Sequence, residues 1–196
     1  MSQVRRLVVG VTGASGAVYA QRLLGYLRDV GPELGVEAHV VFSKVARLVY
    51  EEELGESPKD LGLPIWSPND MTAPFASGSA DYYGMVVVPC TGGSLARIAH
   101  GMSTDLVGRA ADVMLKERRK LVLVLRESPY SMVHIRNMLA VTEAGAVVLP
   151  ASPSFYSHPG TMTELVDTVT ARILDQLGVP NELVRRWDGQ LKGGSS

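Results

Sequence analysis

The chain has 196 residues, 46% of them hydrophobic, and is therefore long enough to bury the core of one domain. Its formal net charge of −1 argues against nucleic acid or an anionic membrane as the main partner. A single cysteine and the lack of an apolar run of roughly 18 residues exclude a disulfide framework and a membrane span, so we expect a cytoplasmic protein without a signal peptide.

The first expected element is a buried parallel strand over residues 7–11, because this stretch is apolar on both faces. A turn of small residues, 12–16, and an apolar helix from Ala17 follow it. Such a unit presents free N–H groups and a positive helix end to an anion. The spacing G-x-x-G-x-x-G differs from the dinucleotide pattern G-x-G-x-x-G, and no acidic residue ends the second strand. A lone phosphate, as in FMN, therefore fits better than NAD, and a turn that binds nothing is the alternative.

The second strand is expected at Glu37–Phe42, and Ser43 follows it as the first residue of a turn into a helix over 44–53. Ser43 therefore lies at the carboxyl end of a strand, where open α/β sheets bind ligands. A plain N-cap is an equally good interpretation of this serine. Residues 55–70 are rich in Gly, Pro and Ser and contain at most a short edge strand at 64–67.

A second strand–turn–helix unit is expected further along the chain. A buried strand at Tyr83–Val88 is stopped by Pro89, small residues fill 90–94, and a helix starts at Leu95. Right-handed crossovers place both small-residue turns at one edge of the sheet. If the two strands are neighbours, the turns flank the topological switch point and form one crevice.

The remaining elements continue the alternation of strands and helices. We expect helices at 105–119, 131–144 and 161–177, the last with a capping box of Thr161 and Glu164, strands at 120–125 and 146–149, and a short tail helix at 183–187. This pattern predicts a three-layer α/β/α doubly wound parallel sheet with strand order 3-2-1-4-5-6. One domain is expected over residues 1–190, followed by a disordered tail at 191–196.

Several ionisable side chains stand out from this pattern. Arg126 and Glu127 follow a buried strand, where packing does not require charge, so Glu127 is a candidate proton carrier unless the two form a surface ion pair. Lys116 and Arg172 lie on predicted helices, where solvation is the usual role of such residues. Tyr156 lies in a Pro/Ser loop and is more suggestive of a site than a core tyrosine.

The sequence gives little support for a nucleophile or a metal site. Cys90 follows an apolar strand and is more often an inert small hydrophobe than a nucleophile in that position. The four histidines are scattered and no pair has the spacing of metal ligands, so we expect no metal. The histidines are His39, His100, His134 and His158.

Long stretches of the chain resemble the UbiX family of flavin prenyltransferases over nearly its whole length. The most specific is the run RAADVMLKERR followed by RESP. The matching stretches are GVTGASGA (10–17), SKVAR (43–47), ASGS (76–79), GRAADVMLKERRKLVLVLRESPYS (108–131), HIRNML (134–139), GAVVLPASPSFYSHP (145–159) and RILDQLG (172–178).

The resemblance implies transfer of a dimethylallyl group from dimethylallyl phosphate to N5 and C6 of reduced FMN, which yields prenylated FMN for a partner UbiD-type decarboxylase. It also implies a homo-oligomer, a dodecamer whose sites form between subunits. The implied flavin contacts are Gly13, Ala14, Ser15, Ser43, Thr91, Gly92, Gly93, Ser94 and Arg126. The implied prenyl-phosphate contacts are Lys116, Tyr156, Arg172 and Glu53, and catalytic roles are implied for Glu127, Lys116 and Ser15.

Two other functions remain open at this point. A flavin-dependent decarboxylase of the phosphopantothenoylcysteine type shares the first turn, but the chain has no P-x-M-N-x-x-M-W stretch. A non-catalytic FMN carrier is the second, and it would not need Lys, Tyr and Arg for another phosphate. The sequence does not decide between a monophosphate and a diphosphate donor, and it leaves the client decarboxylase and any role of Trp187 undetermined.

Overall fold

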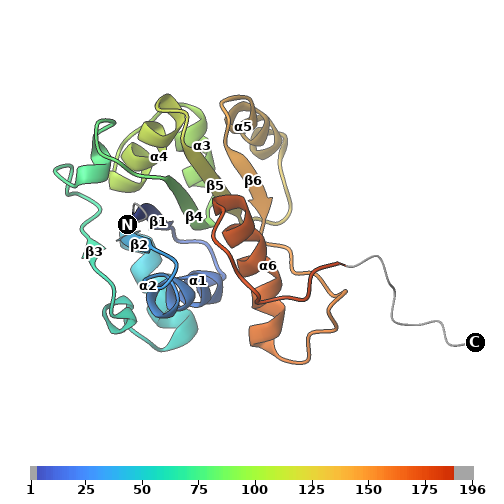
Figure 1. Ribbon diagram of the computed structural model, residues 1–196. Helices are drawn as coiled ribbons and strands as arrows, with labels where there is room; N and C mark the ends of the chain where they lie inside the picture. Colours follow the sequence, from blue (N-terminus) through green and yellow to red (C-terminus); the bar gives the residue numbers. More distant parts are fainter. Residues whose placement is uncertain (1–3, 188–196) are drawn as a thin grey trace, which may run out of the picture.

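Six parallel strands form the central layer of the molecule. The computed structural model describes residues 4–187, and Figure 1 shows the sheet between two layers of helices. The strands are β1 (Arg5–Val11), β2 (Val36–Phe42), β3 (Ile65–Trp66), β4 (Gly84–Cys90), β5 (Lys120–Leu125) and β6 (Val147–Pro150). Their order is β3-β2-β1-β4-β5-β6, which confirms the predicted topology and makes β1 and β4 neighbours.

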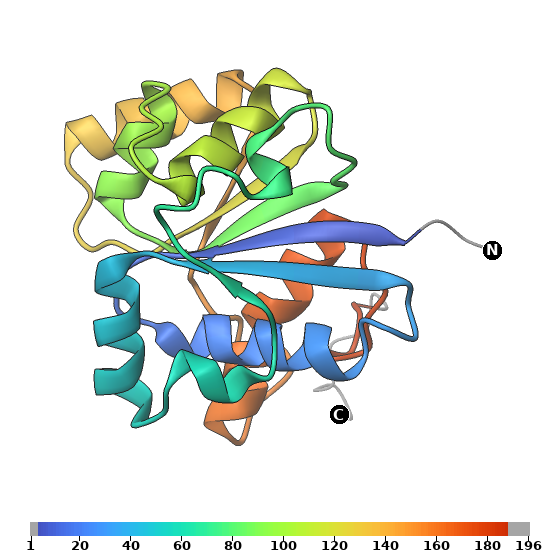
Figure 2. The same cartoon turned by 90° about the vertical axis from the view of Figure 1, so that its left-hand side faces the viewer.

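Helices cover both faces of the sheet (Figure 2). The helices α1, α2 and α6 pack on one face, and α3, α4 and α5 pack on the other. The α-helices are α1 (Ala17–Asp29), α2 (Lys44–Leu54), α3 (Gly92–Ala99), α4 (Leu106–Lys116), α5 (Met132–Glu143) and α6 (Met162–Leu177), and the 3-10 helices are η1 (Pro58–Leu61) and η2 (Pro74–Ala76).

The apolar runs of the strands supply two separate cores because successive side chains alternate between the faces. In β1, Leu7 and Val9 pack toward α1 and α6, whereas Val8 packs toward α4. Gly10 lies on the α4 side, where an added Cβ would be 3.0 Å from both Met85 Cε and Val107 Cγ1. A glycine there allows α4 to approach the sheet closely.

Two boundaries near the second turn differ from the prediction. Pro89 does not stop the strand: β4 continues to Cys90. The hydrogen-bonded pairing of β4 with β5 shifts its register between Val87 and Cys90. An irregular ladder tolerates a residue without an N–H. The following helix begins at Gly92 instead of Leu95, since the Thr91 hydroxyl caps it by accepting the Ser94 N–H at 2.9 Å.

Two predictions near the C-terminus are also wrong. Residues 183–187 form no helix, because five residues are too few to be helical alone and Gly178, with φ 67°, ends α6. The capping box is half formed: the Thr161 hydroxyl accepts the Glu164 N–H at 3.2 Å, but the Glu164 carboxylate accepts the Gly160 N–H. The predicted disordered tail, 191–196, lies outside the described residues.

Every helix within residues 4–187 is too short or too polar to cross a membrane. In the same part of the chain, no group of three or more His, Cys, Asp or Glu side chains is placed to hold a metal ion.

Candidate active site

A buried hydroxyl joins the two small-residue turns at the carboxyl edge of the sheet. Thr12 Oγ1 donates to the Pro89 carbonyl at 2.7 Å and accepts the Thr91 N–H at 3.0 Å. The Thr12 N–H also donates to Pro89, at 3.3 Å. The turns after β1 and β4 are thus fixed next to each other, as the switch-point argument predicted. Sequence reasoning treated Thr12 as one small residue among several and missed this role.

The first turn is packed tightly against the start of α2. A Cβ on Gly13 would lie 2.5 Å from Val45 Cγ1, so only glycine fits at this position. The Ser43 N–H donates to the Val11 carbonyl at 2.9 Å, and its hydroxyl accepts the Ala46 N–H at 3.1 Å. Ser43 is therefore an N-cap and also lies beside the end of β1, so the two interpretations of this residue are compatible.

A protein carboxylate occupies the positive end of α1. Glu53 Oε2 accepts the Gly16 N–H at 2.9 Å and the Ala17 N–H at 2.7 Å. These are N–H groups that the sequence led us to expect free for a ligand anion. Burial would raise the pKa of Glu53, but the hydrogen bonds from Ser15, Ala17 and Gly16 and the charge of Arg126 together hold that pKa below its usual value.

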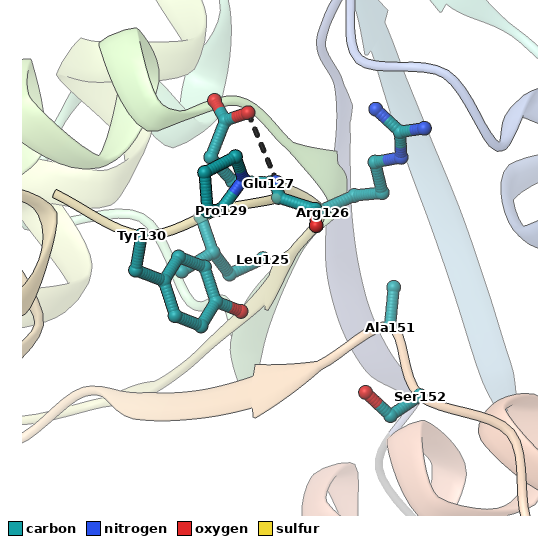
Figure 3. A pocket seen from close by; sticks show the side chains of 8 residues that line it. Leu125, Arg126, Glu127, Pro129, Tyr130, Ala151 and Ser152 are labelled. Carbon is teal, nitrogen blue, oxygen red and sulfur yellow. Dashed lines mark hydrogen bonds between the residues drawn. The ribbon is translucent and has the colours of Figure 1, made fainter.

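Arg126 and Glu127 point in opposite directions from the end of β5 (Figure 3). They are not the surface ion pair that was the alternative interpretation, and among residues 4–187 no carboxylate pairs with Arg126. Burial raises the pKa of Tyr19, and the positive Arg126 nearby partly offsets that effect. Arg126 thus has no direct ion pair among residues 4–187 and lies on the side of the first turn, close enough to Tyr19 and Glu53 to influence their pKa values.

Glu127 lies on the side of the second turn. Its Oε1 accepts the Ser128 N–H at 3.1 Å, which is the dashed line in Figure 3. A Cβ on Gly92 would lie 3.1 Å from Glu127 Oε2 and 2.9 Å from His134 Nε2. Glycine at this position therefore lets Glu127 and His134 pack against the N-terminus of α3.

An open cavity of about 380 Å³ lies beside these two residues. It follows the ends of β5 and β6, where the Ala151 N–H donates to the Leu125 carbonyl at 2.9 Å. The lining residues are Leu125, Arg126, Glu127, Ser128, Pro129, Tyr130, Ala151 and Ser152 (Figure 3).

Lys116 lies at the opposite edge of the sheet, where the strands begin. It ends α4, four residues before β5 begins, whereas Glu127 follows the end of β5. The six residues of β5 span about 20 Å at roughly 3.3 Å per residue, so one chain does not bring Lys116 and Glu127 together. The ammonium of Lys116 forms an ion pair with Glu117.

The loop at residues 76–80 lies next to Lys116. Arg109 Nε donates to the Ala76 carbonyl at 2.9 Å, and Arg119 donates to the Gly78 and Ala80 carbonyls at 2.9 Å and 2.7 Å. The two sequence stretches ASGS and RAADVMLKERR therefore contact each other. Sequence reasoning did not single out either arginine, although both lie in the longest matching stretch.

Tyr156 and Arg172 form a third group, on and beside α6. Tyr156 is 80% exposed, and its ring meets the exposed Trp187 edge-to-face with centroids 6.1 Å apart. Arg172 pairs with Asp175 at 3.0 Å, and Arg186 pairs with the same carboxylate at 2.9 Å. The structure gives neither Tyr156 nor Arg172 a hydrogen bond to the residues at the carboxyl edge of the sheet.

The carboxyl edge has the features that a flavin mononucleotide requires. Two turns of small residues lie side by side there, with Ser15 and Gly93 exposed, and Arg126 offers a guanidinium that has no ion pair within residues 4–187 to an anionic group. The adjoining cavity is open and has both polar and apolar walls. We expect this edge to hold the flavin.

Comparison with known proteins defines the class first. The chain matches the Flavoprotein family over residues 1–174, so it belongs to that family of α/β proteins. A probable UbiX-like flavin prenyltransferase of Bacillus subtilis is 44% identical over 195 residues, covering 97% of this chain and 94% of the relative. The flavin prenyltransferase UbiX of Pseudomonas aeruginosa is 42% identical and covers 97% of each. The chain is a member of the UbiX flavin prenyltransferase family.

Solved structures agree with this assignment. AnUbiX in complex with FMN and dimethylallyl pyrophosphate has a TM-score of 0.91 and 44% identity, and the match covers 96% of this chain and all of that one. A dodecameric FMN-dependent UbiX-like decarboxylase of Escherichia coli O157:H7 has a TM-score of 0.89 and 45% identity, covering 94% of this chain and all of that one. Both matches confirm the predicted fold.

Replacing Thr12 by valine should loosen the junction of the two turns. The Thr91 N–H would lose its partner in a buried position, and we expect the free energy of unfolding to fall by about 1–3 kcal/mol and FMN to bind more weakly. Thr12→Ser keeps the hydroxyl and is the matched control. Denaturant unfolding and flavin titration of both variants measure the effect. A Thr12→Val protein as stable as wild type would show that the bond is dispensable.

The carboxylate of Glu53 should make stability depend on pH in the acid range. Since its folded pKa lies below the usual value, the ionised form stabilises the fold above about pH 4.5, and this contribution is lost as the pH falls through the folded pKa. The melting temperature of Glu53→Gln should therefore fall less steeply than that of wild type between about pH 5 and pH 3. Glu52→Gln, one residue earlier in α2, is the control. Parallel curves for Glu53→Gln and wild type would refute this coupling.

Proposed function

We propose that this chain transfers a dimethylallyl group from a dimethylallyl phosphate ester to N5 and C6 of reduced FMN, giving prenylated FMN. The observation that carries the proposal is the match to AnUbiX, which was solved with FMN and dimethylallyl pyrophosphate. It is supported by Arg126 and the carboxylate of Glu127, which both line the cavity at the sheet edge where the flavin is expected. Reduced FMN, when bound, supplies the nucleophilic nitrogen and the second carbon that accept the prenyl group.

The first task of the protein is to hold the flavin. We assign this to the two turns joined by Thr12 and to the cation at the end of β5. Backbone N–H groups at the turns and the Arg126 guanidinium suit a phosphate or the polar edge of a flavin ring. The assigned residues are Gly13, Ala14, Ser15, Ser43, Thr91, Gly92, Gly93, Ser94 and Arg126.

The second task is to help the phosphate leave. Breaking the allylic C–O bond places negative charge on the departing phosphate, and fixed cations and hydroxyl donors stabilise that charge. Lys116, Arg172 and the Tyr156 hydroxyl have the required chemistry. Ser15 and Glu53 lie together at the start of α1, where Glu53 would orient the Ser15 hydroxyl.

The third task is to remove a proton. Joining C6 to the prenyl group forms a carbon–carbon bond and consumes the allylic double bond, so one carbon of that double bond gains a proton while the hydrogen on C6 leaves as a proton. Glu127 is a half-buried carboxylate beside the cavity and can accept it, and the released phosphate is the other available base. In this scheme Glu127 acts as the acid–base group and contributes little to holding the flavin.

The site requires more than one copy of the chain. Lys116 and Glu127 lie at opposite edges of the sheet, so a second subunit must supply one of them to a shared site. Exposed apolar side chains on α5 are available for such contacts, and they are Met132, Val133, Ile135 and Leu139. We assign the chain a homo-oligomeric state, a dodecamer like that of the Escherichia coli relative.

The product and donor are assigned by their chemistry. Prenylated FMN is a modified cofactor, and we propose that a UbiD-type decarboxylase receives it. Dimethylallyl monophosphate and the pyrophosphate with which AnUbiX was solved are both candidate donors. Parallel assays with the two esters decide this point.

A second candidate activity follows from the relatives. The Escherichia coli structure and one from Aquifex aeolicus, 39% identical, are described as decarboxylases. A decarboxylase would release carbon dioxide from an acid and leave the flavin mass unchanged. A carrier without catalysis would also leave the flavin unchanged.

Mass spectrometry of the flavin separates these functions. The purified protein is loaded with FMN, reduced without oxygen, and incubated with dimethylallyl monophosphate. A flavin heavier by one five-carbon unit supports the proposal. Unmodified FMN, from protein whose flavin content has been verified, contradicts it.

Two substitutions should separate the proton-transfer step from donor binding. Glu127→Gln should keep its flavin and slow turnover by roughly a hundredfold, which is about 3 kcal/mol of barrier. Lys116→Ala should lose both donor affinity and rate, because the phosphate loses a cation. Donor titrations with pre-reduced FMN distinguish the two effects. Wild-type turnover by Glu127→Gln would leave the phosphate as the base.

A further inference from the structure

The first turn of α5 places a histidine beside the proposed proton carrier. A Cβ atom added to Gly92 would lie 2.9 Å from His134 Nε2 and 3.1 Å from Glu127 Oε2, so both atoms face the same point. The two side chains come from different segments and converge on the N-terminus of α3. The structure has no direct hydrogen bond between His134 and Glu127, and a water molecule between the two atoms would complete the link.

The local hydrogen bonds decide which nitrogen of His134 carries the proton. His134 is the third residue of a capping box, a position usually taken by Glu or Gln. The Ser131 N–H donates to His134 Nδ1 at 3.2 Å, and the Ser131 hydroxyl accepts the His134 N–H at 3.3 Å. Because Nδ1 uses its lone pair as an acceptor, the neutral ring carries its proton on Nε2. The nitrogen that faces Gly92 and Glu127 is therefore a donor.

Glu127 has one oxygen left for this donor. Oε1 accepts the Ser128 N–H at 3.1 Å, and Oε2 faces Gly92. The other ionisable groups near it are engaged elsewhere: the Arg126 side chain points away (Figure 3), Arg97 donates to Ser94 Oγ at 3.0 Å, and Tyr130 packs edge-to-face on His134 with centroids 6.5 Å apart.

We propose that His134 is a positioning residue that directs an Nε2–H donor at Oε2 of Glu127 and thereby holds this carboxylate oriented for proton transfer. The inference rests on the proposed prenyl transfer. It adds a residue from α5 to the chemistry of that site. The capping box has two roles in this view, since it starts α5 and also selects the tautomer of His134.

Substitutions at His134 separate these two roles. His134→Glu keeps a good capping-box residue but offers no donor and adds a second negative charge. We expect its kcat to fall at least tenfold with little change in KM for the donor, and the rising limb of its pH–rate profile to move to higher pH. His134→Gln retains both the cap and an N–H donor, so it should keep most of the activity. His134→Ala, which also lacks the donor, replaces the Glu variant if that protein does not fold.

Ser131→Ala is the control for capping alone. It removes the hydroxyl cap but leaves the backbone N–H of residue 131 and the Nε2 donor of His134 in place. It should therefore lower the melting temperature without changing the pH–rate profile. Crystal structures give a readout that does not depend on activity: the Glu127 carboxylate should keep its orientation in the Gln variant and turn away in the Glu variant.

Two outcomes overturn the inference. A His134→Glu protein with the kcat and pH profile of wild type shows that His134 only caps α5. A His134→Gln protein as slow as His134→Glu shows that the donor is not what matters. If wild type itself forms no prenylated FMN, the proposed function fails instead, and the orientation of Glu127 in the crystal structures still tests the contact.

Discussion

The hydrogen bonds of the Thr12 hydroxyl are the point on which the candidate site depends. Parallel pairing of β1 with β4 brings two small-residue turns to one edge of the sheet, but pairing alone does not fix how the turns face each other. Thr12 does so by binding Pro89 and Thr91 together. Its buried position makes these bonds costly to break. Gly13 and Gly92 then let neighbouring side chains pack against the turns: Val45 against the first, and Glu127 with His134 against the second.

The length of a strand sets the second constraint. Since β5 separates Lys116 from Glu127 by its full six residues, a single chain carries the two groups at opposite edges of its sheet. The 76–80 loop, held by Arg109 and Arg119, belongs with Lys116. The longest matching stretch, residues 108–131, carries Lys116 at one edge of the sheet and Glu127 at the other. A protein whose sites form between subunits would need both residues, each supplied by a different chain. The assembly is therefore part of the chemistry in this account.

Much of this arrangement was predictable from the sequence, for identifiable reasons. Apolar runs and small-residue turns predicted the alternation of strands and helices and placed both turns at one edge of the sheet, because parallel crossovers are right-handed. Contacts between distant residues were not predictable. Nothing in the sequence indicates that Glu53 binds the start of α1, that Arg126 and Glu127 point apart, or that His134 reaches Gly92. The tail helix failed because five apolar and charged residues do not overcome the cost of starting a helix.

The central claim is that each site takes Lys116 from one subunit and Glu127 from another. Co-expression of Lys116→Ala chains with Glu127→Gln chains tests it most directly, with each variant also purified alone. Mixed oligomers contain some sites with both wild-type residues, so they should form prenylated FMN far faster than either variant alone. If the mixed oligomers, shown by mass spectrometry to contain both chains, are no faster than the separate variants, the two residues do not meet between subunits and the account is wrong.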